Sequence, residues 1–466
     1  MSHPQDVPLT GHNTAYAICF WQGLGNLFPW NAFITAAHYF AMRFCGTAFE
    51  SNFENYFSVA FMLSQTTGLA LAIRYQDHMP LTQRVLGPLL ITAAVFVMTT
   101  ILVTIDVNKN LLFIITLLSC MVVGLSNALL SGGLFGLCGS FPPQYTGALM
   151  GGQGLAGLAV SVASIVTTWA GNPVDICTDD DVDDDDGSCE EGTDYSALAY
   201  FCVTCVVMGT CVFSFLALMS LPFTKYFQEK SLADHARGPS VDDDVTKALI
   251  QRLTNNSMDE ETENLVDTKG TAPPVDVQPA AISPAKVMKV FKQVKPAALG
   301  AYMSYLVTLS LFPSITVLIE SQKQCDSNAS RFNNDLFIPF FFLMFNLFDF
   351  FGRVFAGIHH LGITKENVLL PICLRVVFVP LFLLCNVSGS QLPVVFKSDA
   401  WPILFMIVFA FTNGHFSTMA MMFGPSMVSA RNSGLAGTIM IFFLTFGLLS
   451  GAAMSFVLLY ISQGSI

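Results

Sequence analysis

The chain has 466 residues, of which 53% are hydrophobic and only 12% charged, and its net charge is -12 at pH 7. A water-soluble domain cannot cover so much apolar surface with so few charged side chains, so the composition excludes a soluble enzyme or binding protein. The chain must be solvated by a lipid bilayer. Its negative charge is concentrated in two loops, so it is a local property that does not indicate a basic partner, and no nucleic-acid partner is expected.

Eleven apolar segments predict an all-α polytopic membrane protein, because a helix needs about 20 apolar residues to cross the hydrocarbon core. An odd number of transmembrane helices puts the two termini on opposite sides of the membrane. In chain order the segments cover residues 16–39, 57–75, 85–105, 111–137, 149–169, 197–221, 297–319, 336–358, 368–385, 401–423 and 435–461.

The basic residues orient these helices, since cationic loops stay on the cytoplasmic side during insertion. With the N-terminus inside, residues 222–296 alone place ten of the 21 Lys and Arg residues in the cytoplasm. We therefore expect an integral protein of the plasma membrane with a cytoplasmic N-terminus and an extracellular C-terminus. No cleavable signal peptide is expected, because the first apolar stretch is long and lacks a small-residue cleavage site.

Two long polar segments interrupt the helices. Residues 171–196 are predicted to be an extracellular loop whose acidic run is typical of a solvated segment; a calcium site is the alternative, but the EF-hand ligand pattern is missing. Residues 222–296 mix charged residues with Ser, Thr and Pro without apolar periodicity, which predicts a disordered cytoplasmic linker. In the outer loops Asn328 is the glycosylation candidate, and Cys177 with Cys189 is the favoured disulfide pair.

The linker separates an N-terminal half, residues 1–221 with six helices, from a C-terminal half, residues 297–466 with five. A sequence in the first helix, Leu-Phe-Pro, recurs in the seventh, and Gly-Leu-Ala-Gly in the fifth recurs in the eleventh, at nearly the same offset. We interpret this as a 6+5 pseudo-repeat of the major-facilitator type, in which substrate lies between the halves near the bilayer midplane. Pro29 and Pro313 are expected to bend helices one and seven.

Charged residues within membrane helices are costly and are therefore candidates for a functional site. Asp349 and Arg353 are four residues apart in the eighth helix, so they share a face and can neutralise each other, and Asn346 joins that face. A carboxylate accepts and a guanidinium donates hydrogen bonds, which suits a polyhydroxyl ligand such as ribose. An ion pair that only locks two helices together is the alternative.

Three further residues carry chemistry in apolar surroundings. Trp30, followed by Asn31, lies near the middle of the first helix and offers a flat face for a base, with core filling as the alternative. Arg375 is expected to anchor helix packing or a gate rather than touch substrate. His415 could shuttle protons, although a packed, neutral histidine is the preferred interpretation.

Five segments resemble the signature sequences of the equilibrative nucleoside transporter family, and they cover nearly all of the transmembrane chain. This resemblance implies a major-facilitator-like fold with 11 helices, no cofactor, and facilitated diffusion of nucleosides such as adenosine and uridine, and also of nucleobases, by alternating access. The segments are Gly23-Leu-Gly-Asn-Leu-Phe-Pro-Trp-Asn31, Gly151-Gly-Gln-Gly-Leu-Ala-Gly157, Phe345-Asn-Leu-Phe-Asp-Phe-Phe-Gly-Arg353, Ala400-Trp401 and Phe409-Ala-Phe-Thr-Asn-Gly414.

The resemblance also implies a substrate pocket. The family's ribose-contacting acid and arginine match Asp349 and Arg353, and its pocket tryptophan matches Trp30. Where some members have a base-contacting glutamine and an upstream glycine on helix four, this chain has Ser131 and Asn127, a departure that bears on purine against pyrimidine preference. Further pocket positions match Leu27, Asn31, Ile34, Asn346 and Leu448.

Two other functions compete with this one. A major-facilitator carrier of another polar organic solute, such as a sugar or an organic cation, would have the same architecture, and a proton-coupled nucleoside symporter would need Asp349 to carry a proton. We expect a uniporter, because Arg353 favours the ionised carboxylate. An enzyme is not expected, since neither a phosphate-binding loop nor a zinc motif is present in the sequence.

Overall fold

The computed structural model describes residues 11–50, 52–105, 107–171, 195–236, 282–326 and 329–464, and they form an all-helical protein. Within these ranges nine helices are long and apolar enough to cross a membrane. They are α3 (Phe53–Tyr75), α4 (Leu81–Thr104), α5 (Lys109–Gly139), α6 (Pro143–Ala170), α7 (Tyr195–Ser220), α10 (Pro284–Leu311), α11 (Phe337–Ala356), α14 (Ala400–Ser426) and α15 (Ala430–Gln463).

The other two expected spans are helical but are not both long and apolar enough to be counted among these nine helices. The first corresponds to α1 (His12–Thr35) and the short α2 (Ala37–Phe44), and α1 is less apolar because it carries several amide side chains. The ninth is broken into α12 (Leu369–Leu374), a 3-10 turn and α13 (Phe378–Leu383). The all-helical membrane architecture is therefore confirmed, whereas the count of eleven spans is not.

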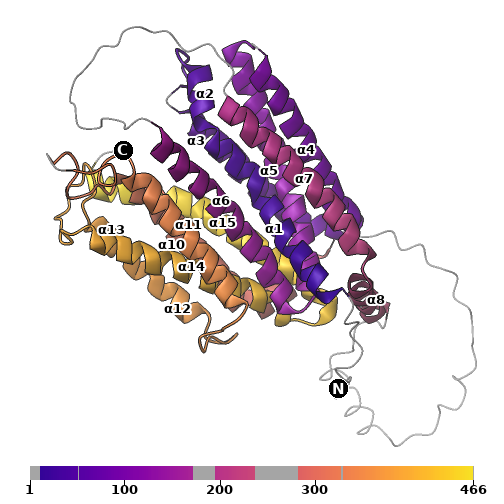
Figure 1. Ribbon diagram of the computed structural model, residues 1–466. Helices are drawn as coiled ribbons and strands as arrows, with labels where there is room; N and C mark the ends of the chain where they lie inside the picture. Colours follow the sequence, from indigo (N-terminus) through magenta and orange to yellow (C-terminus); the bar gives the residue numbers. More distant parts are fainter. Residues whose placement is uncertain are drawn as a thin grey trace, which may run out of the picture.

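The helices form two groups that lie side by side (Figure 1). One group contains α1 to α7 and the other α10 to α15, and they meet where α6 packs against α11 and where α5 packs against α15. The short helix α8 (Pro222–Ala236) lies at one end of the molecule, which we call the α8 end, and α15 finishes at the opposite end. The predicted boundaries of the two halves, residues 1–221 and 297–466, stay a prediction.

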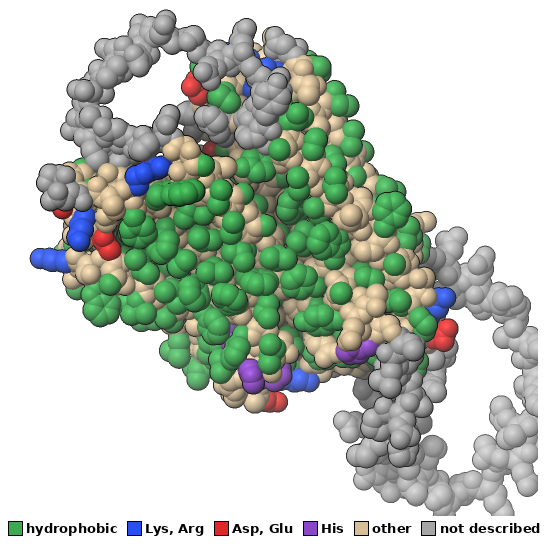
Figure 2. Space-filling model, viewed as in Figure 1, with side chains coloured by type: hydrophobic (Ala, Val, Ile, Leu, Met, Phe, Trp, Pro, Cys, Tyr) green, Lys and Arg blue, Asp and Glu red, His purple; other side chains and the backbone are tan. Residues whose placement is uncertain are grey.

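Apolar side chains cover the outside of the helices. Figure 2 shows hydrophobic groups over the middle of one face, with Lys, Arg, Asp, Glu and His side chains near the two ends. Phe213, on α7, is 74% exposed, and many other large apolar residues on α3, α4 and α5 are also exposed. Such a surface is stable only against lipid, because a soluble protein rarely leaves so large an apolar patch in water.

Glycines let the two halves approach closely at the α8 end. A Cβ atom on Gly437 of α15 would collide with the backbone carbonyl oxygen of Phe135 on α5, and Gly136 and Gly434 face each other through their backbones. Small residues at helix contacts allow such backbone approach in membrane proteins. The contact between α5 and α15 at this end therefore brings main-chain atoms together directly, and the hydroxyl of Thr438 adds a hydrogen bond to the carbonyl of Gly132.

A basic side chain joins the halves at the opposite end. Arg331, in the loop before α11, donates hydrogen bonds to the carbonyl oxygens of Thr168 (2.8 Å) and Trp169 (3.0 Å) at the end of α6, and it forms an ion pair with Asp335 at 2.7 Å. A cation suits the end of a helix, because the last carbonyl groups of α6 lack partners within the helix and carry partial negative charge.

The expected linker, residues 222–296, is shorter than predicted because helices occupy both of its ends. α8 covers Pro222–Ala236, where Phe223 and Phe227 are one turn apart and pack against Phe141. α10 begins at Pro284, directly after the capping residue Ser283. Neither helix could be recognised from the sequence, because many charged residues are mixed with their apolar ones. Residues 237–281 lie outside the described part of the chain.

The predicted bend at Pro313 is wrong, since α10 ends at Leu311, before Phe312 and Pro313. Pro29 does lie inside α1. The different outcome has a simple cause: a proline can end a helix as readily as it kinks one.

Several predicted features fall outside the described residues. They are most of the acidic loop 171–196, with Cys177 and Cys189, and the glycosylation candidate Asn328. Cys45 and Cys325 each form a disulfide bond.

Candidate substrate-binding site

A cavity of about 260 Å³ lies between the two halves and receives side chains from eight helices. Nine of the ten residues predicted for the substrate site line it. They are Leu27, Trp30, Asn31, Asn127, Ser131, Asn346, Asp349, Arg353 and Leu448. The tenth, Ile34, does not belong to its lining and is 51% exposed, because it lies further along α1 toward the opposite end.

On the C-terminal side the cavity wall is charged. Arg353 donates from Nε to a carboxylate oxygen of Asp349 at 2.6 Å, and both residues are buried in α11. Arg353 also donates to the hydroxyl of Tyr305 (3.0 Å), and Asn413 donates to the other oxygen of Asp349 (2.7 Å). We call Tyr305, Asp349, Arg353 and Asn413 the charged cluster.

Burial gives this cluster its rigidity. Two opposite charges removed from water attract each other strongly, but each must keep its hydrogen bonds, since an unpaired buried charge is costly. Asp349 and Arg353 satisfy that requirement with each other and with neutral partners. A neutral ligand with several hydroxyl groups can add to such a pair without leaving either charge unpaired.

Arg375 supports the charged cluster from behind. It is buried and does not line the cavity, and it donates to the backbone carbonyl of Ser304 (2.8 Å) and to the hydroxyl of Thr308 (2.9 Å). The hydroxyl groups of Ser304 and Thr308 both donate to the side-chain oxygen of Asn413, which in turn contacts Asp349. A continuous set of hydrogen bonds thus connects Arg375 to the carboxylate, as expected for a residue that positions others.

On the N-terminal side the wall is polar and neutral. The Asn26 amide donates to Asn127 (2.8 Å) and to Ser131 (2.9 Å), and its oxygen accepts from Gln153 (2.8 Å). All four residues line the cavity and come from α1, α5 and α6. We call Asn26, Asn127, Ser131 and Gln153 the amide cluster.

Aromatic rings complete the cavity. Trp30 is stacked on Phe61 with ring centroids 4.3 Å apart, and Phe312 is stacked on Phe345 at 3.9 Å. All four residues line the cavity, the first pair from the N-terminal half and the second from the C-terminal half. Flat apolar surfaces beside polar groups are suited to a ligand that has both a ring and hydroxyl groups.

Four residues in these clusters were not assigned from the sequence: Asn26, Gln153, Tyr305 and Asn413. Three of them belong to segments that carry the family resemblance. The signal that could have found them is an amide side chain inside an otherwise apolar helix, which needs a partner in the membrane interior.

His415 belongs to neither cluster. It is fully buried beside the rings of Phe355, Phe411 and Phe416, and within the described residues neither ring nitrogen has a hydrogen-bond partner. An apolar setting of this kind favours the neutral form. The position agrees with a packed histidine rather than a proton relay.

Sequence comparisons give consistent relatives. Residues 117–460 match a family model described as "Nucleoside transporter". Equilibrative nucleoside transporter 2 of Rattus norvegicus is 31% identical, over 94% of this chain and 95% of its own. Equilibrative nucleoside transporter 1 of Homo sapiens is 30% identical, over 97% of this chain and 98% of its own.

Solved structures with a similar fold have little sequence in common with this chain. The major facilitator superfamily proton:xylose symporter XylE superposes with a TM-score of 0.58 at 9% identity, covering 96% of this chain and 86% of that one. The human organic anion transporter MFSD10 gives 0.52 at 12% identity, covering 97% and 95%. These likenesses show a fold of the major-facilitator type.

Proposed function

Because the chain belongs to the equilibrative nucleoside transporter family and therefore transports nucleosides, we propose that its substrate binds in the central cavity between the charged cluster and the amide cluster. The observation that carries this proposal is the buried pair of Asp349 and Arg353 in the cavity wall. An ion pair is costly to bury, and one that lines a cavity between two mobile halves is available to a ligand.

The ribose is assigned to the charged cluster. Its hydroxyl groups can donate to Asp349 and accept from Arg353, and such hydrogen bonds to charged groups are stronger than those between neutral ones. The ligand adds no charge of its own, so the pair stays balanced.

The base is assigned to the aromatic and amide side of the cavity. Trp30, stacked on Phe61, provides a flat surface, and the amide cluster provides donors and acceptors. Amide groups can satisfy each other when no substrate is present, so several arrangements of ring nitrogens and oxygens can replace those bonds. This supports adenosine and uridine, and nucleobases, as substrates.

Transport by alternating access requires contacts at the two ends to break in turn. At the α8 end the contacts include the backbone approach of α5 and α15 and the hydrogen bond from Thr438 to Gln76, and at the opposite end they include Arg331 against α6. The halves would rock about the central cavity as these contacts open and close.

We place the α8 end in the cytoplasm and the end of α15 outside the cell, in the plasma membrane. The support is the basic first half of α10 at the α8 end, with Lys286, Lys289, Lys292 and Lys295. Cationic segments are retained inside. In this arrangement α1 and the broken α12 to α13 segment also cross the bilayer, giving eleven spans.

Uptake of radiolabelled adenosine and uridine into cells that lack nucleoside transport tests the proposal. We expect saturable uptake that stops when the inner and outer concentrations are equal, and that an imposed proton gradient does not drive further. Asp349→Ala should abolish uptake while the protein still reaches the cell surface. Glu366→Gln, which removes an exposed acid from a loop, is the matched control.

Two results would overturn parts of this assignment. Accumulation driven by a proton gradient would replace the uniporter with a symporter. Unchanged uptake in the Asp349→Ala variant would remove the ribose from the charged cluster.

A further inference from the structure

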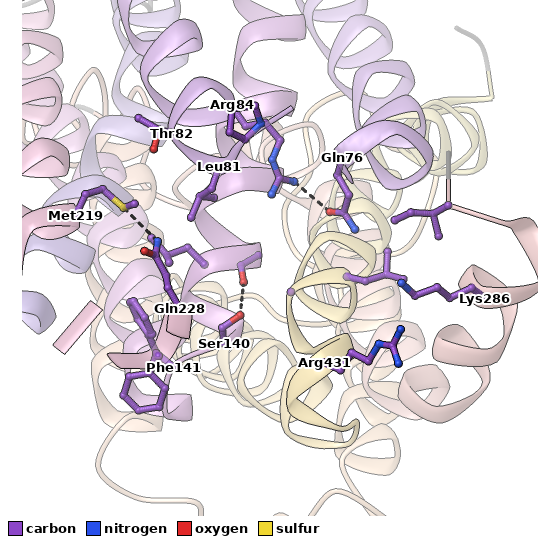
Figure 3. A pocket seen from close by; sticks show the side chains of 17 residues that line it. Gln76, Leu81, Thr82, Arg84, Ser140, Phe141, Met219, Gln228, Lys286 and Arg431 are labelled. Carbon is purple, nitrogen blue, oxygen red and sulfur yellow. Dashed lines mark hydrogen bonds between the residues drawn. The ribbon is translucent and has the colours of Figure 1, made fainter. Parts of the chain in front are cut away.

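A second cavity, of about 560 Å³, lies at the α8 end and is larger than the substrate cavity. Its walls come from α4, α5 and α7 of one half, from α8, and from α10 and α15 of the other half. Figure 3 shows polar and apolar side chains surrounding the same space. The volume lies within the range of about 300–1,000 Å³ in which proteins bind small organic molecules.

The charged side chains of this cavity are basic. Arg84 on α4, Lys286 on α10 and Arg431 on α15 line it, and none of its described lining residues is Asp or Glu. All three are half-buried, and Lys286 and Arg431 extend toward the same space (Figure 3). Like charges repel more strongly when they are partly shielded from water, so an anion bound beside Lys286 and Arg431 would stabilise these two side chains.

The chemistry of the walls suits a phosphate-bearing ligand. Arginine can contact phosphate oxygens through two parallel hydrogen bonds, and lysine provides a point charge. Gln76, Gln228 and Ser140 add neutral donors, while Phe141 and Phe227 provide apolar surface for the rest of the molecule. A cavity of this size has room for more than a single inorganic ion.

The cavity also joins the halves where they approach. The side-chain oxygen of Gln76 accepts hydrogen bonds from Arg84 (3.2 Å) and from Thr438 of α15 (3.0 Å), and Gly434 of α15 is part of the cavity wall. A ligand that contacts α4 and α15 together can bind well only while this end is closed. It would therefore shift the population toward that conformation.

We propose that this α8-end cavity binds a phosphate-bearing ligand and that binding slows nucleoside transport by holding the α8 end closed. The ligand is either a soluble phosphorylated metabolite or the headgroup of an anionic phospholipid. The site is separate from the substrate cavity, so a saturating ligand lowers the maximal rate of transport without competing with nucleoside.

Binding is measured on the full-length protein in nanodiscs. In one arm the lipid is neutral phosphatidylcholine and the probe is ATP; in the other, phosphatidylinositol 4,5-bisphosphate is added to the disc. We expect the double variant Lys286→Gln, Arg431→Gln to weaken binding of the effective probe by at least tenfold. The exchange Lys286→Arg, Arg431→Lys, which keeps both charges, should retain most of it.

The matched control is Lys292→Gln, Lys295→Gln, which removes the same charge from exposed positions of α10 that do not line the cavity. Thermal unfolding and adenosine binding show whether each variant is folded. Binding of ATP identifies the soluble source and binding of the inositol lipid the membrane source, and either supports the proposal. It is overturned if neither probe binds, or if the folded Lys286→Gln, Arg431→Gln protein binds as tightly as the control.

Uptake into proteoliposomes then tests the consequence for transport. The effective probe should lower the maximal rate of adenosine uptake by the wild-type protein several-fold and leave that of the Lys286→Gln, Arg431→Gln variant unchanged. Equal inhibition of both proteins, or none of the wild type, would contradict the regulatory part of the proposal. Because adenosine uptake without the probe is measured in the same vesicles, failure of this inference is distinguishable from failure of the proposed function.

Discussion

The charged cluster and the amide cluster face the same cavity but are built on different principles. In the charged cluster Asp349 and Arg353 depend on each other, because either one alone would be an unpaired charge away from water. In the amide cluster Asn26 shares its hydrogen bonds among three neutral partners, so the loss of one leaves the others in place. The first arrangement is suited to a part of the substrate that never varies, and the second to a part that does.

The largest effect is expected when one member of the ion pair is neutralised. Asp349→Asn leaves Arg353 buried without its carboxylate, which costs roughly 3–5 kcal/mol. Since about 1.4 kcal/mol corresponds to a factor of ten, we expect adenosine uptake to fall at least about 100-fold. Uptake is normalised to the amount of protein at the cell surface, and thermal unfolding is measured on the purified variant.

A double variant separates substrate binding from helix packing. In Asp349→Asn, Arg353→Gln neither member of the pair is left as an unpaired charge, and buried Arg375 keeps its neutral hydrogen-bond partners, so stability should recover in part relative to the single variant. Uptake should stay lost, because the ribose has no charged partner. Recovery of uptake together with stability would mean that the pair only locks helices.

A smaller effect is expected from Asn413, the neutral member of the charged cluster. Asn413→Ala removes the donor to Asp349 and the acceptor for Ser304 and Thr308. A buried hydrogen bond to a charged group contributes about 1.5–3 kcal/mol, so adenosine and uridine uptake should both fall about tenfold or more. Asn110→Ala, at an exposed position of α5, is the control.

If Asn413→Ala altered the preference between the two nucleosides rather than lowering both rates together, the two clusters would not divide the substrate as proposed. Ribose is common to adenosine and uridine. A change in the ribose site must therefore affect both alike.

The smallest total effect, and the most selective one, is expected in the amide cluster. Ser131→Ala removes one acceptor from Asn26 and leaves Asn127 in place, so total uptake should change less than about fivefold, given about 1 kcal/mol for a neutral hydrogen bond. The ratio of adenosine to uridine uptake should shift more than either rate alone.

Ser119→Ala is the matched control for this change, because Ser119 is also buried in α5 but donates only to the backbone of Ile115 within its own helix. An unchanged ratio in Ser131→Ala, equal to that in Ser119→Ala, would remove Ser131 from the base site.

The sequence predicts those site residues that can be recognised from their near neighbours along the chain. Asp349 and Arg353 are one helical turn apart, so their pairing follows from spacing alone, and Trp30 and Asn31 follow a proline in an apolar helix. Asn26, Gln153 and Asn413 were missed because their partners come from helices more than 60 residues away along the chain. Side-chain networks of this kind depend on how helices pack, which hydropathy does not encode.

The fold, like the site, has features that the sequence predicts and features that it does not. Long apolar segments predicted most helices. The break between α12 and α13 was not predicted, and the end of α10 at Leu311 was missed because a proline can either end a helix or kink it. The helical start of the expected linker was missed because it packs through Phe223 and Phe227 against Phe141, a contact that the sequence does not reveal.

The glycine contact between α5 and α15 has a consequence for the time course of transport. Backbone atoms cannot keep a contact by changing rotamer when the neighbouring helix moves away. Dispersion attraction also falls steeply over the first ångström of separation. We therefore expect the contact between Gly437 and the carbonyl of Phe135 to be either made or lost, with intermediate separations little populated. A single protein observed over time should switch abruptly between open and closed at this end, with waiting times far longer than the switching itself.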